Sequence, residues 1–303
     1  MESVTDRMPE PAWDEAERAV DAAAQAAESA ARAAGVTVRE ITDLRELTGV
    51  CLLYNEIWRP DPHNPPVTAE LLRALTKAGN YVVGAFDGPE LMGACVGFFG
   101  PPTDAAMHSH IAGVSAAAHG RSVGFALKVH QRAWAMQHGV TTIAWTFDPL
   151  VRRNAYFNVV KLSATPAEYL TNFYGGMHDS INSNDDTDRL LVQWDLYLPA
   201  VEAACVGKIE PRDAEAERSR GAVVGLASSP EGGPIAGTLD GPTVLVAVPP
   251  DIETLRTTDP GQAKEWRVAL REALATLMAD GARVAGFDRA GWYVVTRESE
   301  RAS

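Results

Sequence analysis

The sequence has few cysteines, no long apolar run and no signal for secretion. Its three cysteines, Cys51, Cys95 and Cys205, have no metal-ligand spacing and form no disulfide framework, which favours a reducing cytosol. No apolar stretch approaches the roughly 18 residues of a membrane span. The N-terminus is acidic and lacks the apolar core of a signal peptide. We therefore expect a cytoplasmic protein.

The chain is also short of positive charge. It carries 27 Lys and Arg against 40 Asp and Glu, a net charge of −13. Nucleic acids and anionic membranes require a cationic surface, so both are excluded as general partners. A local basic pocket for a phosphorylated ligand remains open. With 46% hydrophobic and 22% charged residues over 303 positions, the chain predicts one large globular domain or two ordinary ones.

Sequence patterns divide the chain into four parts. Residues 9–34 are rich in alanine and predict a helix with few large apolar groups, such as Trp13 and Val20. We interpret this helix as an accessory or oligomer-contact element, or as a frayed extension, and we expect a homodimer. Residues 36–199 predict the order β-α-α-β-β-β-α-β-α-β-β, with a tight hairpin at Asp87-Gly88. The expected parts are an N-terminal helical extension (1–35), a main domain (36–200), a linker or long loop (201–242) and a βαββ unit (243–303) that packs on the main domain or on a partner subunit.

The segment 108–138 is the most informative part of the sequence for chemistry. A strand runs into a turn that contains Gly120 and Gly124, and a strong amphipathic helix follows. Unpaired N–H groups and the positive end of a helix dipole point to the same spot there, which suits an anion. Arg121 adds a possible charge-assisted contact. The alternative is that the glycines serve only the turn and close helix packing.

The element order and the string GVSAAAHGRSVGFALK resemble the central motif of the GNAT superfamily of acyl-CoA N-acyltransferases. The strings AWTFDPLVRRNAYFNVVKLSA and TDRLLVQWDL, and the C-terminal part, resemble a subgroup with a C-terminal extension, of which some members look like amino-acid N-succinyltransferases. The resemblance covers residues 37–297. It implies an α/β (α+β) GNAT fold, with a mixed, mostly antiparallel central sheet flanked by helices. It also implies acetyl-CoA or succinyl-CoA as co-substrate, with no metal.

The motif departs from the family pattern at several positions. In the register set by Val114, the loop is His119-Gly120-Arg121-Ser122-Val123-Gly124, and Ser122 stands where the family has its first glycine. A Cβ at Ser122 crowds the CoA pyrophosphate if that position needs a positive φ. Val159 occupies the place of the tyrosine that protonates the departing thiolate in many GNAT enzymes. Tyr156 or Tyr174, or water, is left as the acid.

Two histidines on the strand before the loop are candidates for the base that deprotonates the amine. His108 and His110 are two residues apart, so they share one face of the strand, and an imidazole suits general-base work. The alternative is that they are ordinary rim histidines, and a metal site lacks a third ligand. By resemblance, the cofactor arm lies near Phe147, Asn154 and Asn158, and the acceptor pocket lies near Tyr174.

The sequence therefore predicts an acyl-CoA-dependent N-acyltransferase that acts on the amine of a small metabolite or amino acid by direct attack in a ternary complex. Two alternatives stay open: a GNAT-fold enzyme of another class, such as a lyase or cyclase with a degenerate CoA loop, and a non-catalytic binding protein. The predicted catalytic residues are His108, His110 and Tyr174. The predicted cofactor-binding residues are Val114, His119, Gly120, Arg121, Ser122, Val123, Gly124, Phe147, Asn154 and Asn158.

Overall fold

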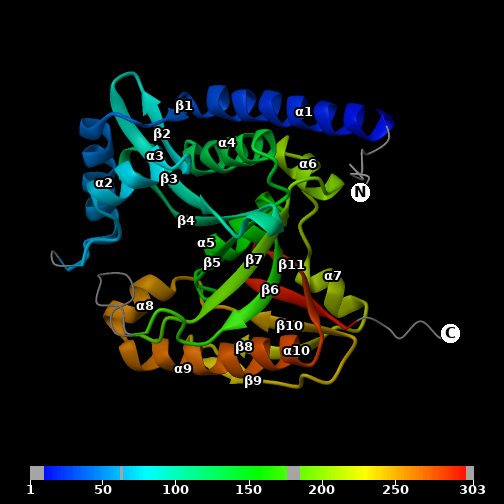
Figure 1. Ribbon diagram of the computed structural model, residues 1–303. Coiled ribbons are helices and arrows are strands. Elements are labelled where there is room, and N and C mark those ends of the chain that lie inside the picture. Colours follow the sequence, from blue (N-terminus) through cyan, green and yellow to red (C-terminus); the bar gives the residue numbers. More distant parts are fainter. Residues whose placement is uncertain (1–9, 62–63, 176–184, 298–303) are drawn as a thin grey trace, which may run out of the picture. The chain divides into compact units, whose positions relative to one another are not determined.

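The computed structural model describes residues 10–61, 64–175 and 185–297 (Figure 1). The chain divides into two compact units. The first comprises residues 1–53, 69–143 and 196–206, and the second comprises residues 54–68, 144–195 and 207–303. No helix in the described part of the chain is both long and apolar enough to cross a bilayer.

The elements of residues 36–199 follow the order predicted from the sequence. The larger sheet has seven strands in the order β1-β2-β3-β4-β5-β7-β6, so the predicted mixed α/β class is confirmed. The elements of the first unit are α1 (Glu10–Ala34), β1 (Thr37–Glu40), α3 (Ala69–Lys77), β2 (Tyr81–Asp87), β3 (Glu90–Phe99), β4 (Ala106–Val114), α4 (Val123–Gln137) and α6 (Pro199–Cys205), with single 3₁₀ turns at Pro102–Asp104 and Ala116–Ala118. Two elements, α2 (Leu44–Trp58) and β5 (Thr142–Phe147), span the boundary.

Strands β1 to β4 form an antiparallel meander, and α4 packs against β2, β3 and β4. The predicted hairpin at Asp87-Gly88 joins β2 to β3, and Gly88 has φ +56°. Strand β4 contains a β-bulge, because Val96 pairs with Ile111 while Gly97 pairs with Ser109. His110 is therefore the extra residue of the bulge.

Helix α1 runs along α4 in the first unit (Figure 1). Its alanines Ala23, Ala26, Ala27 and Ala34 are buried, so short side chains allow the two helices to approach closely. The predicted helix over residues 9–34 is thus present as Glu10–Ala34. The side chain of Trp13, named above as one of its few large apolar groups, lies outside the described residues.

The second unit contains a five-stranded sheet in the order β11-β12-β10-β8-β9, with β8 parallel to β10. It also contains the antiparallel pair β6 and β7. Helix α9 packs against the five-stranded sheet at β9 (Figure 1). The elements of this unit are α5 (Arg152–Ala155), a π-helix (Tyr156–Lys161), β6 (Thr165–Leu170), β7 (Arg189–Asp195), α7 (Ala214–Ser219), β8 (Val223–Ser228), β9 (Pro234–Ala236), β10 (Thr243–Ala247), α8 (Ile252–Thr258), α9 (Pro260–Leu270), a second π-helix (Arg271–Ala275), α10 (Thr276–Ala279), β11 (Arg283–Asp288) and β12 (Trp292–Thr296).

Three stretches differ from the local structure that the sequence predicts. Residues 201–242, expected as a linker or long loop, contain α7, β8 and β9, whose three to six residues give weak periodicity. Residues 152–161 begin as an α-helix but continue as a π-helix. The string EYLTNFYG, residues 168–175, predicts a strand through Tyr174, but β6 ends at Leu170 and the chain then forms a turn in which Asn172 has φ +45°.

Candidate functional site

In the first unit, His108 and His110 lie together on one face of β4. Their ring centroids are 6.1 Å apart, and the Phe98 ring of β3 lies 5.2 Å from His108 and 5.8 Å from His110. Ser109 points to the opposite face, where it is buried. The sequence therefore predicted the shared face correctly. Because His110 is the extra residue of the bulge, its side chain points in a different direction from that in a regular strand.

Both imidazoles are held in their neutral form. Partial burial lowers the pKa of His110, and burial, the neighbouring His110 and the Lys128 ammonium all lower the pKa of His108. Lys128 is fully buried behind the strand, where it donates hydrogen bonds to Ser109 Oγ at 3.2 Å and to Gln131 Oε1 at 2.5 Å. A neutral imidazole near pH 7 can accept a proton, which is the state that a general base requires.

The loop after β4 brings the chain into α4 through two residues with left-handed backbone. Gly120 has φ +81°, and Ser122, the residue that caps α4, has φ +62° and ψ +22°. Because left-handed backbone brings Cβ close to the following carbonyl oxygen, Ser122 is strained by roughly 1–2 kcal/mol where glycine is not. The position that carries glycine in the family pattern thus does need a positive φ in this chain.

The N-terminus of α4 offers unpaired backbone donors. The first hydrogen bond of the helix runs from Ala126 N to Ser122 O at 3.1 Å, so the N–H groups of Val123, Gly124 and Phe125 have no acceptor within the helix. A Cβ on Gly124 would meet Val114 Cγ2 at 3.6 Å, an ordinary contact. The end of a 15-residue helix with these donors suits an anionic group such as a pyrophosphate.

Arg121 binds within the protein. Its guanidinium pairs with Asp87 at 2.9 Å and donates to the carbonyl oxygens of Ala34 at 3.3 Å and Gly35 at 3.0 Å. It thereby ties the end of α1 to the loop. His119 is exposed and Val114 is half-buried. A phosphate contact by Arg121 would therefore replace bonds that the guanidinium already makes.

In the second unit, two predicted residues are bonded to side chains of β5. Asn158 lies in the π-helix, is buried, and accepts a hydrogen bond from Trp145 Nε1 at 3.0 Å. The Tyr174 hydroxyl lies 3.2 Å from Thr146 Oγ1. A single π-helical turn inside a helix is frequent at functional sites, because it changes where side chains point. Sequence reasoning missed Trp145 as the partner of Asn158.

The next feature is the burial and the contacts of Phe147, Asn154 and Tyr174 in the second unit. Phe147 is buried at the end of β5, and Asn154 is half-buried with its main-chain N–H bonded to Val151 O at 2.9 Å. Tyr174 is 45% exposed, and the Arg189 guanidinium lies 5.3 Å from its ring centroid. Its phenol is therefore open to a ligand on at least one side.

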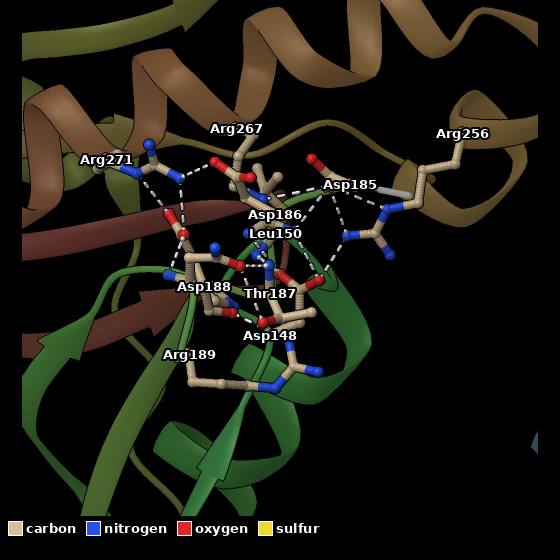
Figure 2. A network of polar contacts seen from close by, with 12 residues as sticks. Asp148, Leu150, Asp185, Asp186, Thr187, Asp188, Arg189, Arg256, Arg267 and Arg271 are labelled. Atoms are coloured by element: carbon tan, nitrogen blue, oxygen red, sulfur yellow. Dashed lines mark hydrogen bonds and ion pairs between the residues drawn. The ribbon is translucent and has the colours of Figure 1, made fainter. Parts of the chain in front are cut away.

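A buried ionic network follows directly after β5 (Figure 2). Asp148 binds Arg256 Nη2 at 2.5 Å and the Arg267 guanidinium at 2.8 and 3.0 Å, and Asp185 binds the same two arginines at 3.0–3.2 Å. All four residues are less than 9% exposed. Nearby, Asp188 binds Arg271 at 2.7–2.8 Å and accepts the Tyr169 hydroxyl at 2.7 Å.

The network shifts the pKa values of Asp148 and Tyr169. Burial alone would raise the pKa of Asp148, but the charges and hydrogen bonds of Arg267 and Arg256 outweigh it and hold that pKa well below its ordinary value. Burial and the Asp188 carboxylate raise the pKa of Tyr169. Both oxygens of the Asp148 carboxylate are occupied within the protein, since Oδ1 also accepts the N–H of Leu150 at 2.9 Å. No group of three or more His, Cys, Asp or Glu in the described ranges is placed to hold a metal ion.

Comparison with known proteins gives likenesses in structure alone. No protein-family model and no curated protein sequence matches the chain. The N-acetyltransferase from Staphylococcus aureus Mu50 is 15% identical, with a TM-score of 0.43, and the match covers 53% of this chain and 98% of that one. The ribosomal-protein-alanine N-acetyltransferase from Brucella melitensis is 14% identical, with a TM-score of 0.45, and the match covers 52% of this chain and 99% of that one. The ribosomal-protein-S18-alanine N-acetyltransferase from Escherichia coli is 10% identical, with a TM-score of 0.41, and the match covers 54% of this chain and 95% of that one.

All three of these solved structures are N-acetyltransferases. Likenesses of this extent carry neither an activity nor a substrate from one protein to another. Nothing in them bears on the succinyltransferase subgroup. The chemistry must therefore be argued from the residues of this chain.

The strain at Ser122 gives a first prediction. Ser122→Gly relieves the left-handed backbone and should raise the free energy of unfolding by roughly 0.5–1 kcal/mol. Ser29→Gly, an exposed helical position in α1, should lower it, because glycine weakens a helix interior. Urea denaturation measures both. Loss of stability in Ser122→Gly would show that the position is not strained.

The ionic network gives a second prediction. Arg267→Met leaves two buried carboxylates short of a partner and should cost about 3–5 kcal/mol of unfolding free energy. The matched control is Arg153→Met, since Arg153 pairs with Glu253 while its side chain is 70% exposed, and this change should cost at most about 1 kcal/mol. Chemical denaturation at pH 7 compares them, and equal losses would contradict a special role for the buried set.

Proposed function

We propose that this protein is a GNAT-type acyltransferase that moves an acyl group from an acyl-CoA to the amine of a small molecule. One observation carries the proposal: in the first unit, a bulged strand with paired neutral histidines runs through a left-handed turn into a helix end with free N–H groups. One continuous segment thus offers a base and an anion site. The resemblance of the same segment to the GNAT motif supports this assignment.

The loop and the helix end would hold the CoA pyrophosphate. The N–H groups of Val123, Gly124 and Phe125 provide directed donors, and Gly120 and Ser122 give the turn its shape. In the second unit, Phe147, Asn154 and Asn158 are assigned to the pantetheine arm. Asn158 is compatible with this role, because only its side-chain oxygen is used, as the acceptor from Trp145 Nε1. Its side-chain NH₂ group remains available to donate to a ligand.

The reaction is a direct displacement. The amine nitrogen forms a bond to the thioester carbonyl carbon, the carbon–sulfur bond breaks, and CoA leaves as a thiol once its sulfur takes a proton. His108 or His110 takes the proton that the amine loses. Tyr174 is assigned as the acid, since Val159 cannot donate a proton. Positioning of the two substrates and polarisation of the carbonyl by backbone N–H groups supply the rest.

The finer features extend the same proposal. The acyl donor is acetyl-CoA or succinyl-CoA, and the acceptor is an amino acid or a related small metabolite. The protein is a cytoplasmic homodimer, and residues 243–303 are a C-terminal extension of the acyltransferase domain. These features rest on the resemblance and on the composition of the sequence.

Calorimetry with CoA and its thioesters tests the proposed cofactor site. Gly124→Asp places a carboxylate at the start of α4, where it suits the helix dipole and its Cβ makes only an ordinary contact with Val114, but it repels a pyrophosphate. We expect wild-type protein to bind acetyl-CoA or succinyl-CoA and this variant to bind it at least about tenfold more weakly.

The control is Ala200→Asp, which adds the same charge at an exposed position in the first turn of α6. It should leave CoA affinity unchanged. No binding of acetyl-CoA, succinyl-CoA or CoA at millimolar concentration, or turnover of an amine substrate without CoA, would overturn the acyltransferase proposal.

The lowered pKa values of the histidines predict the pH dependence of catalysis. A base with a pKa below its ordinary value of about 6.5 is already neutral at pH 7, so kcat/KM should be flat near pH 7 and should fall only at lower pH. Replacing the base with glutamine, as His108→Gln or His110→Gln, should reduce kcat by roughly 10²–10⁴ and remove this acidic limb. Release of free thiol measures the rate, and an unchanged profile in both variants would exclude a histidine base.

A further inference from the structure

The first unit contains a cavity of about 380 Å³ between α1, β1 and α4. Its size lies at the lower end of small-molecule sites. The walls are mostly apolar, and the residues that matter for the inference are Ala24, Ala27, Ala31, Val38, Ala133 and Trp134. All of these belong to one unit, and none is among the residues assigned above to acyl transfer.

The cavity lies beside a stretch of α1 whose buried side chains are those of alanines. Ala23, Ala26 and Ala27 are buried and set the close approach of the helices. Ala24 and Ala31 are half-buried and too short to fill the space beside that contact. A leucine at either position would occupy it.

The uncharged polar residues of the cavity wall are Thr37, His130 and Gln137, and His130 is the half-buried one. His130 Nδ1 bonds the Tyr81 hydroxyl at 3.0 Å, which leaves Nε2 as the other hydrogen-bonding atom of the ring. Trp134 offers only its apolar surface, because its Nε1 donates to Glu40 at 2.9 Å and its ring stacks on His138 at 3.8 Å. Burial lowers the pKa of His130, so the imidazole is neutral near pH 7.

The charges at the cavity cancel. Glu28 and Arg32 line it and pair with each other at 3.4 Å on the exposed side of α1. Among the described lining residues no other side chain is charged, so an ion that entered the cavity would lose water without meeting an unpaired counter-charge. The lining therefore favours an uncharged molecule with an apolar body.

We propose that this cavity binds an uncharged small molecule with an apolar body and a hydrogen-bonding group for His130, and that binding is transmitted to the loop before α4. The transmission follows from Arg121, which bonds the carbonyl oxygens of Ala34 and Gly35 at the end of α1 and also belongs to the loop. A ligand that fixes α1 against α4 thereby biases the segment around Ser122. Binding itself does not depend on the acyltransferase proposal, because no residue of that reaction lines the cavity.

Indole is the probe, and amide NMR of the full-length protein is the measurement. We expect saturable shifts at the cavity with a Kd below about 1 mM. Ala31→Leu fills the cavity and should weaken binding at least about tenfold, while Ala33→Leu, an exposed position on the same helix, should not change it. Ala24→Leu serves the same purpose if Ala31→Leu does not fold. His130→Phe keeps a ring but removes the hydrogen bond, and should weaken binding several-fold.

Transmission is read from the amides of residues 119–124. They should shift with indole in wild-type protein, and Arg121→Gln should suppress these shifts while indole still binds. No saturable shift up to about 5 mM indole, or equal affinity in both cavity-filling variants, would overturn the assignment of the site. Loop shifts that persist in Arg121→Gln would overturn the route through Arg121.

Discussion

Four ionised side chains are withdrawn from water together in the second unit: Asp148, Asp185, Arg256 and Arg267. Each arginine contacts both carboxylates, so the loss of any one member leaves the other three with a net charge. The free energy of desolvating a charged side chain exceeds its electrostatic attraction to one poorly oriented partner. A buried charge without a partner therefore costs several kcal/mol of stability. The four side chains come from the end of β5, from the segment before β7, and from helices α8 and α9 (Figure 2). We infer that the positions of these segments depend on one another.

This constraint reaches the candidate site through β5. Asp148 follows Phe147 directly, and its carboxylate is bonded from two sides, so the end of the strand is fixed in position. Trp145 and Thr146, just before it, bond Asn158 and Tyr174. The residues assigned to the cofactor arm and to the acid are thus oriented by a strand whose own end is held by the ionic set. Precise positioning of reacting groups requires such support from outside the site.

The sequence predicted the order of elements, the hairpin at Asp87-Gly88 and the shared face of His108 and His110, because each depends on local patterns. It did not predict the ionic set. Arg256 and Arg267 lie 108 and 119 residues from Asp148 along the chain, and each reads as an ordinary helix surface residue until the fold brings them together. The bulge at His110 also has no signature in the sequence, because it depends on the pairing of β4 with β3. The π-helix that holds Asn158 reads as plain α-helix for the same reason: the extra residue per turn is set by packing and not by local propensity.

The acidity of the chain bears on how its anion site can work. A net charge of −13 opposes an approaching anion at long range, but at physiological ionic strength that repulsion is screened over about 8 Å. Directed N–H groups act at contact distance, where screening is weak. Arg121, the cation in the loop itself, is engaged by Asp87 and by the end of α1. In the proposed cofactor site, the affinity for a pyrophosphate would therefore rest on the backbone N–H groups of residues 123–125, which follow the turn formed by Gly120 and Ser122.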